Sequence, residues 1–110
     1  MADDTAMRWA GLMGRWVALA QVGVALPEEG EGGRWKRSID ALVGLHAVAA
    51  ALDEVAGWSP ADRAYAADAA SVRVAQHRAH LARVWAGALP DSVAELLDEA
   101  GEAVRAVRET

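Results

Sequence analysis

The chain has no cysteine and no phenylalanine, and lysine occurs only once, at Lys36. Without cysteine, disulfide bonds, thiolate metal sites and thiol catalysis are excluded. The net charge is −5 and no stripe of basic residues could neutralise several phosphates, which disfavours nucleic-acid binding. Arg15 and Gln21 interrupt the most apolar stretch, residues 10–26, and acidic residues precede it. We therefore predict neither an export signal nor a membrane span, and we expect a cytoplasmic protein.

Strand-forming patterns are also scarce, because the valines are scattered among 27 alanines and only three prolines interrupt the chain. This composition favours helix, and 110 residues suffice for one hydrophobic core, so residues 1–110 are predicted to form one domain. Apolar residues recur at spacings of three and four over about residues 4–26, 34–56, 60–86 and 92–108, which predicts four amphipathic helices. Five tryptophans supply most of the aromatic surface, and each buried indole is expected to find a hydrogen-bond partner.

Turn and cap residues separate the four predicted helices. Asp3, Asp4 or Thr5 is expected to cap the first, and residues 27–33 form an acidic, glycine-rich linker that we expect to be mobile. Gly57-Trp58-Ser59-Pro60 combines a C-terminal glycine, an N-cap serine and a proline at the first helical position, and Ser92–Glu95 matches a capping box. Short connections make neighbouring helices antiparallel, so the predicted fold is an all-α, up-down-up-down four-helix bundle.

Some apolar residues lie off the main stripes, namely Val17, Val24, Val43 and Val84. A core rich in alanine buries little area per residue, so a second packing surface would add burial. These valines are compatible with a homodimer.

Polar residues on the alanine-rich side of the third helix suggest a second kind of site. Asp68, Ser71 and Arg78 share that side, with His46 opposite on the second helix. They could form a polar pocket between helices, but we favour inter-helix salt bridges from Asp68 or Arg78. Similarly, Arg34-Trp35-Lys36-Arg37 could anchor an acidic partner through Trp35 and Arg37, although we favour a tryptophan that folds back to cap the bundle.

The three histidines could bind a metal, since His77 and His80 are one turn apart and His46 could face them. The helical wheel instead places His77 and His80 in solvent, away from Val74, Leu81 and Trp85. We predict no metal and no cofactor.

Arg73 and His80, with six residues between them, resemble the Arg-x4-6-His motif of HEPN domains, helical bundles of which many are dimeric ribonucleases. The resemblance implies His80 as general acid or base and Arg73 as stabiliser of phosphorane charge. Ten arginines and three histidines give about 0.8 such matches by chance, and Val74 stands where the family often has a polar residue.

The sequence therefore favours a non-enzymatic interaction or assembly module that binds a protein partner or a second copy of itself. A HEPN-like ribonuclease or toxin component, and a binder of a metal or small ligand within the bundle, are the two alternatives.

Overall fold

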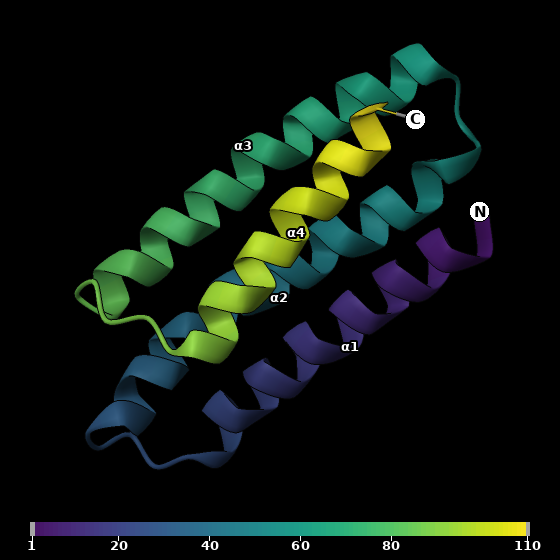
Figure 1. The fold of residues 1–110 in the computed structure, drawn as a ribbon. Helices are drawn as coiled ribbons and strands as arrows, with labels where there is room; N and C mark the ends of the chain where they lie inside the picture. The colour runs from purple at the N-terminus through teal and green to yellow at the C-terminus, as the bar shows by residue number, and fades with distance from the viewer. Residues whose placement is uncertain (1, 110) are drawn as a thin grey trace.

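The computed structural model describes residues 2–109, with side chains for residues 8–55 and 57–109, and shows an all-α four-helix bundle (Figure 1). The helices are α1 (Ala2–Ala25), α2 (Glu31–Glu54), α3 (Pro60–Val84) and α4 (Asp91–Glu109). A short 3-10 helix (Val55–Gly57) follows α2 directly. The four predicted helices are confirmed. No helix in the described part of the chain combines the length and apolarity needed to cross a bilayer.

Ion pairs between the first and last helices show their antiparallel order. Arg8 of α1 pairs with Glu102 of α4, and Arg15 pairs with Glu99. Residue numbers therefore rise along α1 as they fall along α4, as the up-down-up-down arrangement requires. These side chains are largely exposed, so each pair adds little to stability.

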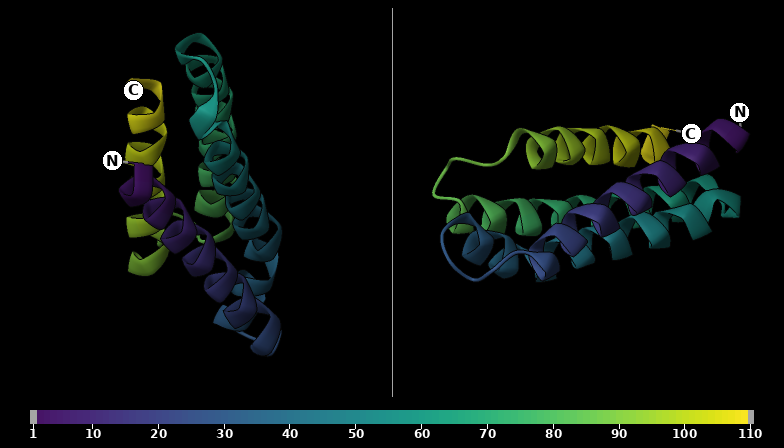
Figure 2. Two further views of the ribbon diagram at one scale, coloured as in Figure 1. Left: turned by 90° about the vertical axis from the view of Figure 1, so that its right-hand side faces the viewer. Right: turned by 90° about the horizontal axis from the view of Figure 1, so that it is seen from below.

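The path of α1 leaves the bundle incompletely closed. This helix packs along α2, while its contact with α4 is less extensive. Figure 2 shows the N-terminal half of α1 beside α4, and its C-terminal end turned away from α4 toward α2. The molecule is correspondingly elongated, with extents of 47 × 23 × 18 Å. The C-terminal half of α1 and the facing part of α2 therefore lie together at the side of the bundle.

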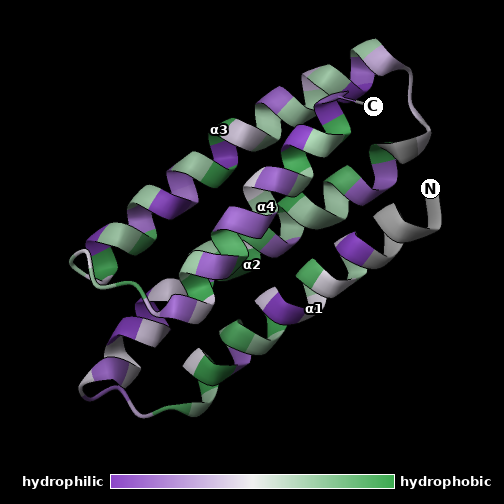
Figure 3. Ribbon diagram, viewed as in Figure 1, coloured by the Kyte–Doolittle hydropathy of each residue, from purple (hydrophilic) through white to green (hydrophobic). Residues whose placement is uncertain are grey.

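The core follows the apolar stripes of the sequence. In Figure 3 hydrophobic and hydrophilic positions alternate along α3 and α4, whereas the C-terminal half of α1 is largely hydrophobic. Trp9 and Trp16 of α1 are almost fully buried, as are Leu81 of α3 and Leu97 of α4. The predicted stripe of the second helix is confirmed in full, because all its members are buried: Ala41, Leu42, Leu45, Val48, Ala49, Leu52 and Val55.

The first connection is shorter than predicted. Helix α2 begins at Glu31 rather than near residue 34, so Gly32 and Gly33 belong to its first turn. Gly30 precedes the helix with a φ of 58°, a left-handed conformation that favours glycine. Gly32 packs so closely on the carbonyl of Pro27 that no side chain would fit there. The predicted mobile linker over residues 27–33 was therefore wrong in extent, because two of its glycines serve close packing inside a helix.

The helix starts confirm one predicted cap and correct two others. Ser59 precedes α3 and its Oγ accepts a hydrogen bond from the Asp62 N–H (3.2 Å), with proline at the first helical position, as predicted. Helix α4 begins one residue earlier than the predicted Ser92 cap, because the carbonyl of Pro90 already accepts from two N–H groups of the first turn. Helix α1 begins at Ala2, so the predicted caps at residues 3–5 lie inside it, and their side chains are outside the described residues.

The helix ends differ from prediction in a similar way. Gly57 ends the 3-10 helix without a positive φ, so it is not the left-handed glycine that was predicted. That role falls after α3, which stops at Val84, two residues short of the predicted end. There Ala86 (φ 52°) and Gly87 (φ 82°) turn the chain toward α4.

Candidate interaction surfaces

Trp35 closes one end of the bundle. It is partly buried against the core, and its ring meets that of Trp85 edge to face, with centroids 5.2 Å apart and an interplanar angle of 76°. The Arg34 guanidinium lies 5.9 Å from the Trp85 ring centroid. Lys36 Nζ donates to the carbonyls of the last turn of α1, at Gly23 (3.2 Å) and Val24 (3.3 Å). These contacts favour the capping interpretation over an exposed anchor.

Ser38 supplies the buried acceptor for Trp85. The serine is fully buried on α2, and its Oγ accepts a hydrogen bond from Trp85 Nε1 (2.9 Å) while donating to the carbonyl of Arg34 (2.8 Å). This pair joins α2 to the end of α3. The expectation that every buried indole has a partner was wrong for Trp16, whose Nε1 meets no acceptor within the described residues.

The histidines do not gather into one site. His77 lies against α2 at Gly44, where an added Cβ would be 2.5 Å from the imidazole Cε1. His80 Nε2 lies 3.3 Å from the carbonyl of Arg37, also on α2. His46 lies instead beside α1. Within the described residues, no three histidine or carboxylate side chains lie close enough together to hold a metal ion.

His77 and His80 are half-buried, so the prediction that both are solvated was wrong. Burial lowers the pKa of His77 below its ordinary value, and positive charge on His80 and Arg73 lowers that pKa further. Neutral imidazole is thus the form that the folded chain favours at this position. The helical wheel missed this because Gly44, on another helix, opens the space that the ring occupies.

Asp68 and Arg78 form ion pairs between α3 and α4. Asp68 Oδ1 lies 2.9 Å from Arg108, and Arg78 lies 3.2 Å from Asp98. Both are inter-helix salt bridges, the interpretation favoured from the sequence. All of these side chains, and Ser71, are exposed rather than packed in a pocket between helices.

An apolar surface lies where α1 and α2 form the side of the bundle. We name it the valine face: exposed Val17 and Val24 of α1 with exposed Val43 of α2. These side chains surround a shallow cavity of about 230 Å³, whose other walls include Ala20 and Ile39. Val84, the fourth predicted member, is half-buried on α3 and lies outside it. No lysine, arginine, aspartate or glutamate lines this cavity.

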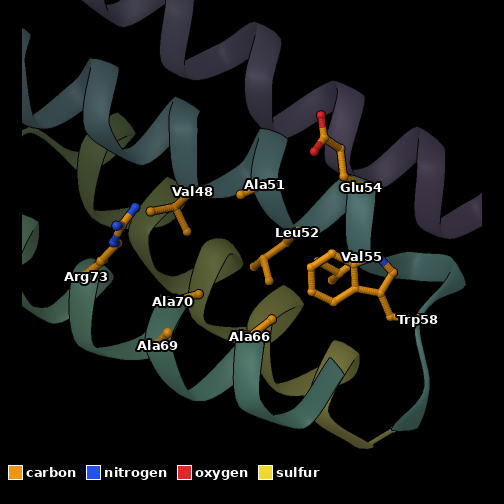
Figure 4. Close-up of a pocket in the computed structure, with 10 residues that line it drawn as sticks. All are labelled: Val48, Ala51, Leu52, Glu54, Val55, Trp58, Ala66, Ala69, Ala70 and Arg73. Carbon is orange, nitrogen blue, oxygen red and sulfur yellow. The ribbon is translucent and has the colours of Figure 1, made fainter. Parts of the chain in front are cut away.

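A second apolar surface lies between α2 and α3, and Figure 4 shows it with its lining side chains. We name it the α2/α3 groove: a cavity of about 270 Å³ with Val48, Leu52 and Val55 on one wall and Ala66, Ala69 and Ala70 on the other. Arg73 lies at the end beside Val48, and Trp58 and Glu54 lie at the opposite end. The groove is therefore apolar along its length, with Arg73 at one end and, on the rim near the other end, Glu54, whose carboxylate points away from the alanine wall.

Exposed aromatic surface borders this groove. Trp58 is 52 % exposed although it lines the cavity. On α3, Tyr65 (79 % exposed) and Val72 (58 %) lie one turn before and one turn after Ala69, so both stand at the edge of the groove. Within the described residues, neither the Arg73 nor the Glu54 side chain makes a hydrogen bond or an ion pair.

Apart from Arg73, the sequence prediction did not include these groove residues among its candidate sites. The available signal was the seven-residue spacing of Tyr65 and Val72, which places both on one side of α3 away from the buried Ala67, Ala70 and Val74. What could not be seen was which residues of α2 face that side. Arg73 was singled out for a different reason, its spacing from His80.

Comparison of the chain with protein-family models, with curated proteins and with solved structures gives no significant match.

Proposed function

We propose that this chain is a non-enzymatic helical assembly module that pairs with a second copy of itself. The observation that carries the proposal is the grouping of its exposed large apolar residues. Within the described residues there are seven, and six of them lie at two surfaces. Val17, Val24 and Val43 form the valine face, and Trp58, Tyr65 and Val72 lie beside the α2/α3 groove. Val22 lies on another side of α1.

The total exposed area supports pairing. The chain exposes 6497 Å², about 700 Å² more than the roughly 5,800 Å² typical of a compact monomer of 11.6 kDa. A standard protein interface covers about 800 Å² of each partner. The excess is therefore about the size of one interface. Clustered apolar area of this kind is typical of protein contact surfaces, and aromatic residues are enriched in them.

A second copy is the partner that these surfaces fit best, because a two-fold dimer needs only one self-complementary patch. The absence of cysteine is compatible with assembly in a reducing cytoplasm, which we include in the proposal.

The ribonuclease alternative depends on Arg73 and His80. His80 Nε2 lies 3.3 Å from the carbonyl of Arg37, so Nδ1 is the nitrogen that would have to exchange a proton with a substrate. Incubating the purified protein with single-stranded RNA is expected to leave the RNA intact, and cleavage that the His80→Ala variant abolishes would establish the alternative instead.

Analytical ultracentrifugation tests the assembly proposal directly. Protein at about 1 µM to about 1 mM covers dimer affinities of roughly −8 to −4 kcal/mol. We expect the weight-average mass to rise with concentration from 11.6 kDa toward about twice that value. A constant mass of 11.6 kDa over the whole range would refute self-association.

A further inference from the structure

We infer that two copies pair through the α2/α3 groove about a two-fold axis, so that Arg73 of each copy lies against Glu54 and Trp58 of the other. The inference rests on the proposed function, and it names the surface and the symmetry of the dimer. It follows from three features of the groove: the opposite charges near its two ends, its exposed tryptophan and its wall of alanines.

The charges select the orientation of the second copy. A two-fold axis of a face-to-face dimer lies in the interface plane. If that axis runs along the groove, Arg73 of one copy faces Arg73 of the other, and like charges meet at both ends. If the axis runs across the groove, the ends exchange and Arg73 faces Glu54 twice. Only the second arrangement matches positive charge with negative charge, so a single chain carries both halves of the complementarity.

The packing of Trp58 favours the same orientation. The ring stands at the Glu54 end of its own groove and remains half exposed. Exchange of the ends places it at the Arg73 end of the other copy, where a guanidinium can stack on an indole face. Alanines at positions 66, 69 and 70 leave one wall of the groove shallow, so a bulky ring from outside has room to enter. Tryptophan, tyrosine and arginine are the residues that most often dominate binding energy at interfaces.

The valine face is the competing surface on the same chain. It is apolar, but no charged side chain lines its cavity, and its exposed members are all aliphatic. Nothing there would fix the orientation of a partner or reject a wrong one. The α2/α3 groove has both an exposed aromatic side chain and a self-complementary charge pattern, so we assign the dimer contact to the groove.

Reciprocal charge reversal provides the experiment. Arg73→Glu places negative charge at both ends of the groove, and Glu54→Arg places positive charge at both ends. Each variant alone then brings like charges together twice across the two-fold axis. We expect each to dimerise at least about 10-fold more weakly than the wild type, because like charges at an interface cost several kcal/mol.

An equimolar mixture of the two variants should regain the dimer, because the negative groove of one meets the positive groove of the other. Native mass spectrometry should show the mixed dimer and little of either homodimer. The double variant Glu54→Arg/Arg73→Glu in one chain should also dimerise, since its ends are again opposite in charge. Recovery on mixing cannot come from misfolded chains, so the result does not depend on how well each single variant folds.

Val43→Glu on the valine face is the matched control, and we expect its dimer affinity to equal that of the wild type within about three-fold. If Val43→Glu dissociates the dimer and the charge variants do not, the proposed function stands but the groove is the wrong surface. If Arg73→Glu and Glu54→Arg dimerise like the wild type, the inference is overturned in the same way. A wild type that stays monomeric at all concentrations overturns both proposals.

Discussion

Replacing Ser38 by alanine removes the hydroxyl that accepts the hydrogen bond of the buried Trp85 indole. Ser38 is 0 % exposed and Trp85 is 3 % exposed, so water cannot replace the lost hydroxyl without entering the core. A buried donor left unpaired costs about 1–3 kcal/mol. Alanine is the better helix former and returns roughly 0.5 kcal/mol within α2. The net loss is therefore about 0.5–2.5 kcal/mol of unfolding free energy.

Urea unfolding followed by far-UV circular dichroism measures this loss. The variant should also melt roughly 2–20 °C below the wild type, at the shift per kcal/mol usual for a domain of this size. All samples need the same protein concentration, because dimerisation raises apparent stability. Ser71→Ala is the matched control, since Ser71 is exposed in the middle of α3, and we expect a change within about 0.5 kcal/mol. If Ser38→Ala proves as stable as Ser71→Ala, the Ser38–Trp85 hydrogen bond does not stabilise the fold.

Three further predictions concern the packing of α2. Gly44→Ala would place its Cβ against the His77 ring. The crowding costs about 1–3 kcal/mol, more than the roughly 1 kcal/mol that alanine adds to a helix, so the variant should be less stable in the same urea assay. Gly14→Ala is the control: nothing lies within 4 Å of its added Cβ, and it should stabilise the fold by about 0.5–1 kcal/mol. The folded chain lowers the pKa of His77 below 6.5, so the contribution of neutral His77 to stability should be complete above pH 6.5 and fall as the pH drops through the folded-state pKa. The His77→Gln variant should therefore lose less stability than the wild type between about pH 7.5 and pH 5. Equal losses would contradict this. Lys36→Met removes the donor to the last carbonyls of α1 and should lower the free energy of unfolding by about 1 kcal/mol. Backbone amides in that turn should exchange faster with solvent. Unchanged exchange would count against the contact.

The helices and the core could be predicted from the sequence because local patterns determine them. The buried stripe of α2 was predicted residue by residue, and Ser59 was identified correctly as the cap of α3. Both depend on spacing and on residues within one turn of one another. The cap of α4 was missed because the Pro90 carbonyl competes with Ser92 for the same role, and the sequence does not show which of two adjacent starts packs better.

Positions that depend on a second helix could not be predicted in this way. His77 was expected in solvent because the wheel of α3 was oriented by its large apolar residues alone. The ring is half-buried because Gly44 faces it from α2, and the pairing of those two residues depends on how the helices are aligned. Asp68 and Arg78 were correctly expected to form salt bridges, but their partners on α4 could not be named before the bundle was assembled.

The same limit explains why the α2/α3 groove was not predicted, although each of its parts is visible in the sequence. The sequence did not indicate that Ala66, Ala69 and Ala70 would be the residues of α3 that lie beside α2, as they do in the structure. Alanine methyl groups are too short to fill the space beside Val48 and Leu52, so close approach leaves a shallow cavity instead of a sealed contact. Arg73 and Glu54 are 19 positions apart on different helices, and only the antiparallel turn through Trp58 places them at opposite ends of that cavity. The small residues at which two helices of one chain meet thus leave room for a side chain from a second chain. The reciprocal charge variants test whether that second chain is another copy of the same protein.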